Sequence, residues 1–151
     1  MNVVVKLPPY LPTEGEFNYE TSISTEDLDY MKQWGVTLVR LGVMWEAVET
    51  SPGYYDMNYL DAVDNLINQF GKDGITVIVD NHQDLFSRRL CGEGVPWFYT
   101  PKDLDHHCPK TLVAQAFHLS PGECVPLDKL GLNYDVNGNP LIEDCQKQDF
   151  M

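Results

Sequence analysis

Positively charged residues are scarce in this sequence. Its 151 residues contain 10 Lys and Arg against 23 Asp and Glu, which gives a formal net charge of −13 at pH 7. A surface with that balance repels phosphate groups, so the sequence predicts no nucleic-acid partner. No run of apolar residues approaches the roughly 20 that a membrane-spanning helix needs, so we expect no transmembrane segment.

Sequence motifs that mark several common activities are also missing. The chain has no Gly-x-Gly-x-x-Gly, no Gly-Lys-Ser/Thr and no Gly-x-Ser-x-Gly motif, so we expect no cofactor and no serine nucleophile of that kind. Residues 1–6 lack the basic and apolar regions of a secretory signal, so the sequence predicts no signal peptide. Hydrophobic residues make up 43% of the chain, which is typical of a domain that folds around a core.

Cysteine is absent from the first 90 residues, and the four cysteines that follow are Cys91, Cys108, Cys124 and Cys145. No pair has the spacing of a zinc knuckle, and four cysteines permit three disulfide pairings. The sequence leaves open whether they form disulfides in an oxidising compartment or stay reduced and partly buried. His106 and His107 stand in a proline-rich stretch, where histidines are usually solvated, so we expect no metal site.

Residues 1–90 alternate between strand and helix patterns. Apolar and β-branched residues predict strands over 3–6, 36–43 and 75–79. The second and third runs are nearly continuous, which is typical of strands buried inside a parallel sheet. We therefore expect a sheet whose central strands are covered by helices.

Two amphipathic helices connect these strands. Residues 24–27 form a capping-box-like start for the first helix, which ends at Gly35. Its predicted apolar side consists of Leu28, Met31 and Trp34. A turn at 51–53 precedes the second helix, which has apolar residues at spacings of three and four over 59–70 and is closed by Gly71.

The order strand, helix, strand, helix, strand predicts an α/β fold with parallel strands and right-handed crossovers. Residues 91–151 differ, because prolines and turn-forming residues recur there and no long periodic segment is present. Roughly 50 residues without regular structure are uncommon inside a compact domain, which indicates that part of the domain lies outside this sequence.

Polar residues of sugar-binding character follow the predicted strands. They are Lys6, Arg40, Trp45, His82 and Asp84. In parallel α/β folds ligands bind at the carboxyl ends of the strands, so these residues are predicted to share one rim. Sugars present many hydroxyl groups and apolar ring faces, which suit hydrogen-bonding side chains and an aromatic platform.

Each of these residues also has a structural interpretation. Arg40 in a buried strand needs a carboxylate partner, and pairing is favoured over exposure at the rim, although the sequence does not show the partner. Alone, His82 would most often be a core histidine that bonds a backbone carbonyl. Asp84 could cap a loop, Trp45 could pack between helix and sheet, and Lys6 could simply be exposed.

Several motifs resemble the amino-terminal part of endoglycoceramidase-type enzymes of glycoside hydrolase family five. They lie at residues 2–10, 31–35, 39–46, 80–84 and 87–96, and residues 138–145 resemble a later stretch of the same enzymes. The resemblance implies a (β/α)8 TIM-barrel glycosidase fold, of which this chain holds about the first three βα units and a long irregular segment. Residues 1–151 would then be a partial catalytic domain with a regular part at 1–90 and a loop region at 91–151.

The resemblance also implies roles for single residues. Arg40 matches the arginine that holds the nucleophile carboxylate, and His82 matches a histidine beside the sugar next to the scissile bond. Asp84 and Lys6 match residues that contact the more distal sugar. The acid/base and nucleophile glutamates are expected beyond residue 151, because the chain has no Asn-Glu dipeptide. Enzymes of this type need no metal and no cofactor.

The leading functional hypothesis is hydrolysis of O-glycosyl bonds in glycosphingolipids with retention, and this chain alone is expected to be inactive. The expected partner is a glycolipid or oligosaccharide, with contact to a membrane-borne lipid substrate. The alternatives are an inactive glycan-binding remnant, a relative of the glucosylceramidase or steryl-glucosidase type, and a small α/β protein of unrelated function. An extracellular or lysosome-like location of the full-length protein fits the resemblance and the cysteines.

Overall fold

The computed structural model describes residues 1–13, 15, 17–18, 21–101 and 129–147. The chain divides into two compact units, Met1–His82 and Gln83–Met151, and each is described by itself. His106, His107, Cys108 and Cys124 lie outside the described residues. No helix among the described residues combines the length and the apolar character needed to cross a membrane.

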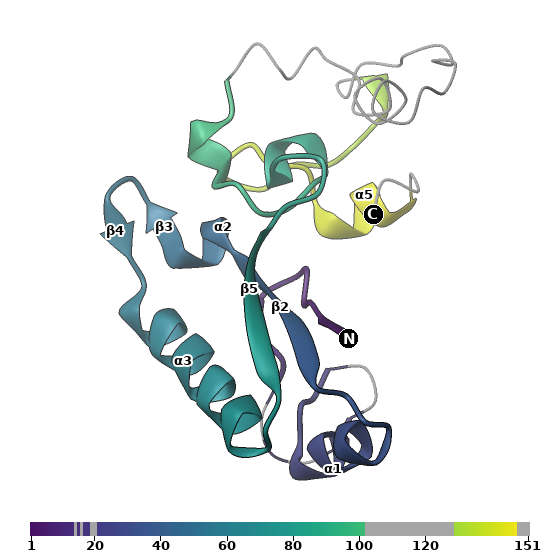
Figure 1. Ribbon diagram of the computed structural model, residues 1–151. Coiled ribbons are helices and arrows are strands. Elements are labelled where there is room, and N and C mark those ends of the chain that lie inside the picture. The colour runs from purple at the N-terminus through teal and green to yellow at the C-terminus, as the bar shows by residue number, and fades with distance from the viewer. Residues whose placement is uncertain (14, 16, 19–20, 102–128, 148–151) are drawn as a thin grey trace, which may run out of the picture. The chain divides into compact units, whose positions relative to one another are not determined.

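The first unit is built on a three-stranded parallel sheet (Figure 1). Its strands β1 (Asn2–Val3), β2 (Leu38–Met44) and β5 (Thr76–His82) lie in the order β1-β2-β5. The predicted parallel arrangement is thus confirmed. The in-register pairs include Asn2 with Arg40, Gly42 with Asp80 and Met44 with His82.

The strand boundaries differ from the prediction in detail. The first strand is shorter than the predicted 3–6, because only Asn2 and Val3 pair with β2. β2 and β5 begin and end later along the chain than predicted, and β5 continues to His82. The prediction of a buried β2 is confirmed, since Val39 and Leu41 are completely buried.

β5 is not buried as predicted. Ile78 is 51% exposed and Val79 is 54% exposed, although neighbouring residues of a strand point to opposite faces of the sheet. The reason is that β5 is an edge strand and pairs with β2 alone among the described residues. An apolar edge strand is unusual in a finished fold, where edges are short, charged or covered.

Helix α1 (Thr25–Gln33) precedes β2 and packs through Leu28 and Met31, which are buried as predicted. The prediction for Trp34 is wrong, because this residue caps the carboxyl end of the helix and is 68% exposed. Its ring stacks on Tyr30, with the ring centroids 5.8 Å apart. The apolar side of α1 is therefore narrower than its spacing predicts.

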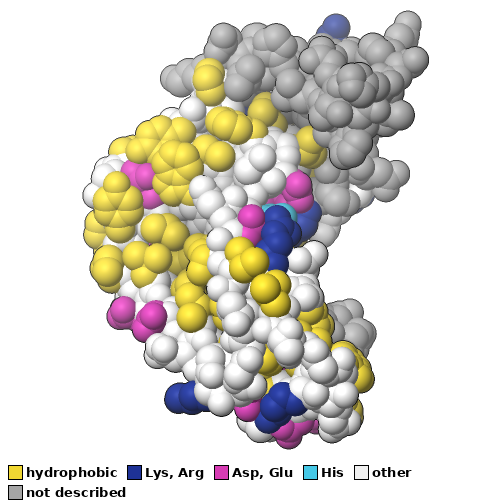
Figure 2. Space-filling view, in the orientation of Figure 1, with side chains coloured by type: hydrophobic (Ala, Val, Ile, Leu, Met, Phe, Trp, Pro, Cys, Tyr) yellow, Lys and Arg dark blue, Asp and Glu magenta, His cyan; other side chains and the backbone are white. Residues whose placement is uncertain are grey.

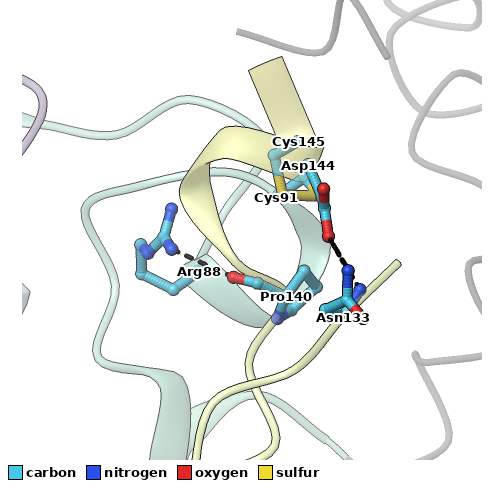
Figure 3. Close-up of a disulfide and its surroundings, with 6 residues drawn as sticks. All are labelled: Arg88, Cys91, Asn133, Pro140, Asp144 and Cys145. Atoms are coloured by element: carbon cyan, nitrogen blue, oxygen red, sulfur yellow. Dashed lines mark hydrogen bonds between the residues drawn. A yellow bond between two sulfur atoms is a disulfide. The ribbon is translucent and has the colours of Figure 1, made fainter. Parts of the chain in front are cut away.

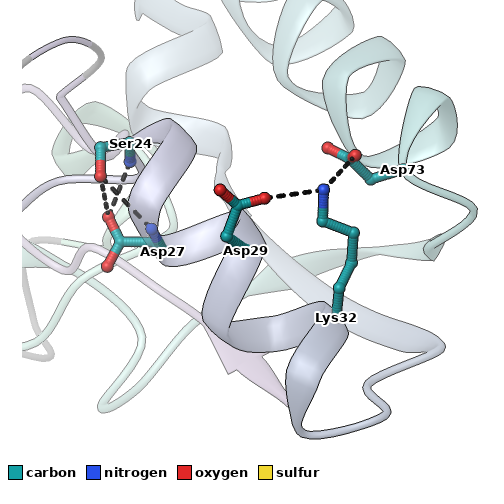
Figure 4. A network of polar contacts seen from close by, with 5 residues as sticks. All are labelled: Ser24, Asp27, Asp29, Lys32 and Asp73. Atoms are coloured by element: carbon teal, nitrogen blue, oxygen red, sulfur yellow. Dashed lines mark hydrogen bonds and ion pairs between the residues drawn. The ribbon is translucent and has the colours of Figure 1, made fainter.

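Polar contacts fix both ends of α1 (Figure 4). The Ser24 hydroxyl accepts a hydrogen bond from the backbone N–H of Asp27, whose carboxylate accepts one from the Ser24 backbone in return at 2.7 Å. This is the predicted capping box. Near the other end, Lys32 contacts Asp29 at 2.8 Å and Asp73 at 2.9 Å, and its hydrogen bonds to these carboxylates raise the pKa of Lys32.

Helix α3 (Met57–Lys72) begins at Asp56, whose side chain accepts two backbone hydrogen bonds. Its buried residues follow the predicted spacing and are Tyr59, Val63, Leu66 and Phe70. The helix runs through Gly71, which was expected to close it, and Gly74 instead adopts the left-handed conformation at φ 74°. Gly71 needs no such conformation, so it continues the helix at a small cost.

A short helix and a hairpin occupy the connection between β2 and α3. Helix α2 (Trp45–Val48) follows β2 directly, and strands β3 (Glu49–Ser51) and β4 (Tyr54–Tyr55) pair antiparallel around Gly53. The sequence predicts only the turn, because strands of two or three residues are too short to show an alternating pattern.

The second unit has little regular structure among its described residues. It contains two 3-10 turns, η1 (Arg88–Leu90) and η2 (Trp97–Tyr99), and the helix α5 (Ile142–Lys147). A disulfide joins Cys91 to Cys145 with an S–S distance of 2.09 Å (Figure 3). This resolves one pairing that the sequence leaves open. Both cysteines are completely buried beside Leu90 and Leu132.

Hydrogen bonds around the disulfide hold the chain segments of this unit together. The Arg88 guanidinium donates to the carbonyl oxygen of Pro140 at 3.1 Å, as Figure 3 shows. The Asp144 carboxylate accepts from the backbone and side-chain N–H groups of Asn133 at 2.9 and 2.8 Å and contacts Lys147 at 2.8 Å. The Lys147 contact and then the Asn133 hydrogen bonds lower the pKa of Asp144 to about 2.

Candidate active-site rim

The candidate site lies on one face of the parallel sheet in the first unit. Side chains alternate between the two faces of a strand, so Arg40 on β2 shares a face with Gly42. Gly42 pairs with Asp80 on β5, and His82 follows two residues later. Arg40, Asp80 and His82 therefore face the same side. His82 ends β5, whereas Arg40 lies four residues before the end of β2.

One carboxylate joins these three residues. Asp80 Oδ2 lies 2.6 Å from Arg40 Nη2 and 2.9 Å from His82 Nδ1. The side chain of Arg40 is 41% exposed, that of Asp80 23% and that of His82 11%. The network is therefore partly shielded from water, and its guanidinium end is the most accessible.

The network answers two points that the sequence leaves open. The prediction that a carboxylate pairs with Arg40 is confirmed, and the partner is Asp80. Sequence reasoning missed Asp80, although its spacing of two from His82 places both residues on one face of a strand. His82 contacts this carboxylate through Nδ1. A neutral imidazole that donates from Nδ1 has Nε2 as its acceptor, so Asp80 selects the tautomer.

Gly42 lets the chain after β1 approach this face closely. A Cβ atom at position 42 would lie only 2.9 Å from Cγ1 of Val4. A residue with a side chain would thus collide with Val4 or displace it. Gly42 consequently leaves the space that the Val4 side chain occupies.

The structure does not bring Trp45 to this face. Trp45 lines an open apolar hollow of about 470 Å³ together with Val43, Val48, Val79 and Asn81. Val43 alternates with Arg40 and Gly42 along β2 and so lies on the opposite face of the sheet. The Trp45 indole N–H donates to Glu49 Oε2 at 2.8 Å. These contacts favour the packing role over the sugar platform, and the latter stays a prediction.

Lys6 and Asp84 are the other two polar residues of the predicted rim. Lys6 follows β1 and is half-buried, so it is not the fully exposed residue that its position beside prolines predicts. Asp84 belongs to the second unit and is exposed. Its backbone pairs with that of Glu93 through two hydrogen bonds of 3.1 and 2.9 Å. The roles of Lys6 and Asp84 in binding a distal sugar stay predictions.

Comparisons with known proteins show the family of this chain. Residues 10–111 match the model of the family described as cellulase (glycosyl hydrolase family 5). The endoglycoceramidase of Cyanea nozakii is 33% identical over 148 residues, which cover 97% of this chain and 26% of that protein. A glucosylceramidase of Rhizopus delemar is 36% identical over 107 residues, which cover 68% of this chain and 16% of that protein.

A solved structure gives the same result. Endo-glycoceramidase II from Rhodococcus sp., in complex with a five-membered iminocyclitol, aligns with a TM-score of 0.51 and 28% identity over 62% of this chain and 24% of that one. The chain thus spans about a quarter or less of the length of these relatives. The predicted (β/α)8 barrel fold is confirmed, and β1, β2 and β5 are its first strands. The chain belongs to glycosyl hydrolase family 5.

Proposed function

We propose that this chain is the amino-terminal part of the catalytic domain of a retaining glycoside hydrolase that releases glycans from glycosphingolipids. The observation that carries this proposal is the likeness to an endoglycoceramidase over 97% of the chain. The position of His82 supports it, because this residue ends β5 and active sites of (β/α)8 barrels lie at the carboxyl ends of the strands.

The chemistry of the network supports a role in positioning. A retaining mechanism needs two carboxyl groups about 5 Å apart, one as nucleophile and one as acid/base. The network holds a single carboxylate, and Asp80 is engaged by both Arg40 and His82. We therefore assign the two catalytic glutamates to sequence outside these 151 residues.

In this proposal Arg40 orients the nucleophile and His82 faces the sugar beside the scissile bond. A guanidinium presents five N–H donors in a fixed fork, so one group can hold Asp80 and a second carboxylate at once. Arg40 is 41% exposed, so the guanidinium is accessible to a further partner. Lys6 and Asp84 are proposed to contact the more distal sugar.

A chimera tests this function. Residues 1–147 replace the matching part of the Cyanea nozakii endoglycoceramidase, and release of the glycan from lactosylceramide is measured. We expect the chimera to release the glycan and Arg40→Gln to lower kcat at least about 100-fold, because a preorganised charge next to the nucleophile is lost. Lys72→Gln, at the carboxyl end of α3, is the matched control and should leave kcat unchanged. A folded chimera without glycan release would contradict the proposal.

The likeness to a glucosylceramidase favours a second candidate, hydrolysis of a lipid that carries a single glucose. The same chimera distinguishes the two when it is assayed on glucosylceramide and a steryl glucoside beside lactosylceramide. Faster release from glucosylceramide would favour the second candidate. If the chimera binds these lipids and cleaves none, this chain is a glycan-binding remnant.

A further inference from the structure

The hairpin between β2 and α3 exposes three large side chains to solvent. Tyr54 is 65% exposed, Tyr55 is 54% exposed, and Met57, which follows at the start of α3, is 61% exposed. We call these three residues the aromatic hairpin. Figure 2 shows hydrophobic side chains gathered on the side of the first unit that carries β3 and β4. Adjacent large apolar residues at the surface commonly mark an interaction site.

The hairpin is held firmly in this exposed position. Glu49, which is 2% exposed, accepts a hydrogen bond from the Gly53 backbone through Oε1 at 2.8 Å and one from the Trp45 indole through Oε2 at 2.8 Å. A buried carboxylate with two such partners ties the turn to α2. Tyr54 and Tyr55 therefore cannot fold back onto the core without breaking a buried polar network.

The topology places the aromatic hairpin at the edge of the sheet that carries the candidate site. β2 ends at Met44 and α3 begins at Met57. The segment with β3 and β4 therefore connects the carboxyl end of β2 to the start of α3. His82 ends β5 at the same edge, in register with Met44. A surface bound by the hairpin would consequently lie on the side from which a substrate reaches Arg40 and His82.

The side chains of the aromatic hairpin indicate which kind of surface it binds. Tyrosine combines an apolar ring with a polar hydroxyl and is enriched where water meets lipid, and methionine is a flexible apolar residue. The sequence has no Lys or Arg between Arg40 and Lys72, whereas Glu46 and Asp56 flank the hairpin. A membrane site for anionic lipids needs clustered basic residues. The hairpin therefore suits a lipid surface without net charge.

We propose that the aromatic hairpin is an interfacial surface that holds the protein on an uncharged or zwitterionic lipid surface. This proposal rests on the proposed function, because glycosphingolipid substrates are displayed at such a surface and binding there would bring the enzyme to them. Tyr54, Tyr55 and Met57 enter the headgroup region, and the carboxyl edge of the sheet then faces the lipid. The hairpin does not itself contact the scissile bond.

Cosedimentation of the full chain with vesicles of pure phosphatidylcholine tests the proposal. We expect the combined substitutions Tyr54→Ser, Tyr55→Ser and Met57→Ser to lower the partition coefficient at least about tenfold. The matched control carries Tyr30→Ser and Trp34→Ser, which remove two exposed aromatic residues from α1 at the opposite end of the strands. This control should bind as the unchanged chain does. Far-UV circular dichroism shows whether each variant keeps its fold.

Three results would overturn the proposal. One is equal vesicle binding by the hairpin variant and the unchanged chain. Another is an equal loss of binding with Ile78→Thr and Val79→Thr, which would assign the binding to the exposed edge strand β5. The third is a dimer of the unchanged chain in sedimentation equilibrium that the hairpin substitutions dissociate, which would make the hairpin an interface between copies.

Vesicles that contain an anionic lipid test the role of charge. Replacing about a fifth of the phosphatidylcholine with phosphatidylserine should weaken binding at low salt, because the chain carries a net charge of −13. Stronger binding to these anionic vesicles would refute the assignment. None of the vesicles contains a glycolipid, so the outcome does not depend on the hydrolase activity measured with the chimera.

Discussion

Asp80→Asn is the most informative single change in the candidate site. The asparagine keeps the shape of the side chain and removes the negative charge of Asp80, which both Arg40 and His82 contact. Exposed ion pairs contribute about 0–1 kcal/mol, whereas charge-assisted hydrogen bonds shielded from water contribute about 1.5–3 kcal/mol. Arg40 is 41% exposed and Asp80 23% exposed, with 2.6 Å between Nη2 and Oδ2. We therefore expect a coupling free energy between them of about 1–2 kcal/mol.

A double-mutant cycle measures this coupling. The free energy of urea unfolding is determined by circular dichroism for the unchanged chain, Asp80→Asn, Arg40→Gln and the double variant. A coupling below about 0.3 kcal/mol, within the error of such a cycle, would refute the ion pair as a stabilising contact. Repeating the cycle in high salt tests the electrostatic origin, since salt screens exposed charges.

A second measurement reports on the imidazole. Asp80 lies within hydrogen-bond distance of His82 Nδ1, so a ¹⁵N spectrum recorded at a pH high enough to keep the imidazole neutral should show a protonated Nδ1 and an unprotonated Nε2. Asp80→Asn should shift His82 toward a mixture of tautomers. A purely structural role for Asp80 would leave the tautomer unchanged, and that outcome would refute its role in positioning His82.

Three further predictions concern stability. Replacing Cys91 and Cys145 with alanine should lower the free energy of unfolding by up to about 4 kcal/mol, because the disulfide spans 54 residues, and an unchanged urea midpoint would contradict this. The pKa of Asp144 is about 2, below its ordinary 3.8, so its contribution should be complete above about pH 5 and disappear between about pH 4 and 2. Asp144→Asn should flatten that part of the profile of urea midpoint against pH, and a variant as pH-dependent as the unchanged chain would disprove the assignment. Gly42→Ala should cost about 1–3 kcal/mol through its collision with Val4, and thermal melting should show recovery when Val4→Ala is added, whereas no recovery would mean that the strain lies elsewhere.

The elements that local chemistry determines could be predicted from the sequence. The Ser24–Asp27 capping box and the spacing of apolar residues in α3 depend on residues within a few positions of one another. The order of strands and helices likewise follows from periodicity and short connections. Together these were sufficient to predict a parallel sheet and the carboxyl edge on which polar residues gather.

The contacts that depend on register could not be predicted in the same way. The pairing of Arg40 with Asp80 requires that Gly42 stand opposite Asp80, and sequence periodicity does not fix how two strands align. The face occupied by Trp45 depends on α2 beginning directly after β2, which no spacing indicates. The disulfide partner of Cys91 could not be predicted, because four cysteines allow three pairings and the sequence favours none of them.

The two open edges of the sheet have a consequence for how fast the domain folds. β1 and β5 each pair only with β2 among the described residues, whereas a closed (β/α)8 barrel leaves no strand unpaired. In a closed barrel, further strands pair with the open edge of the last strand and reach back to the first. The second of these contacts joins residues far apart along the chain, and contacts of large sequence separation slow folding. Closing the ring at β1 is therefore expected to be slower than forming the contacts between β1, β2 and β5.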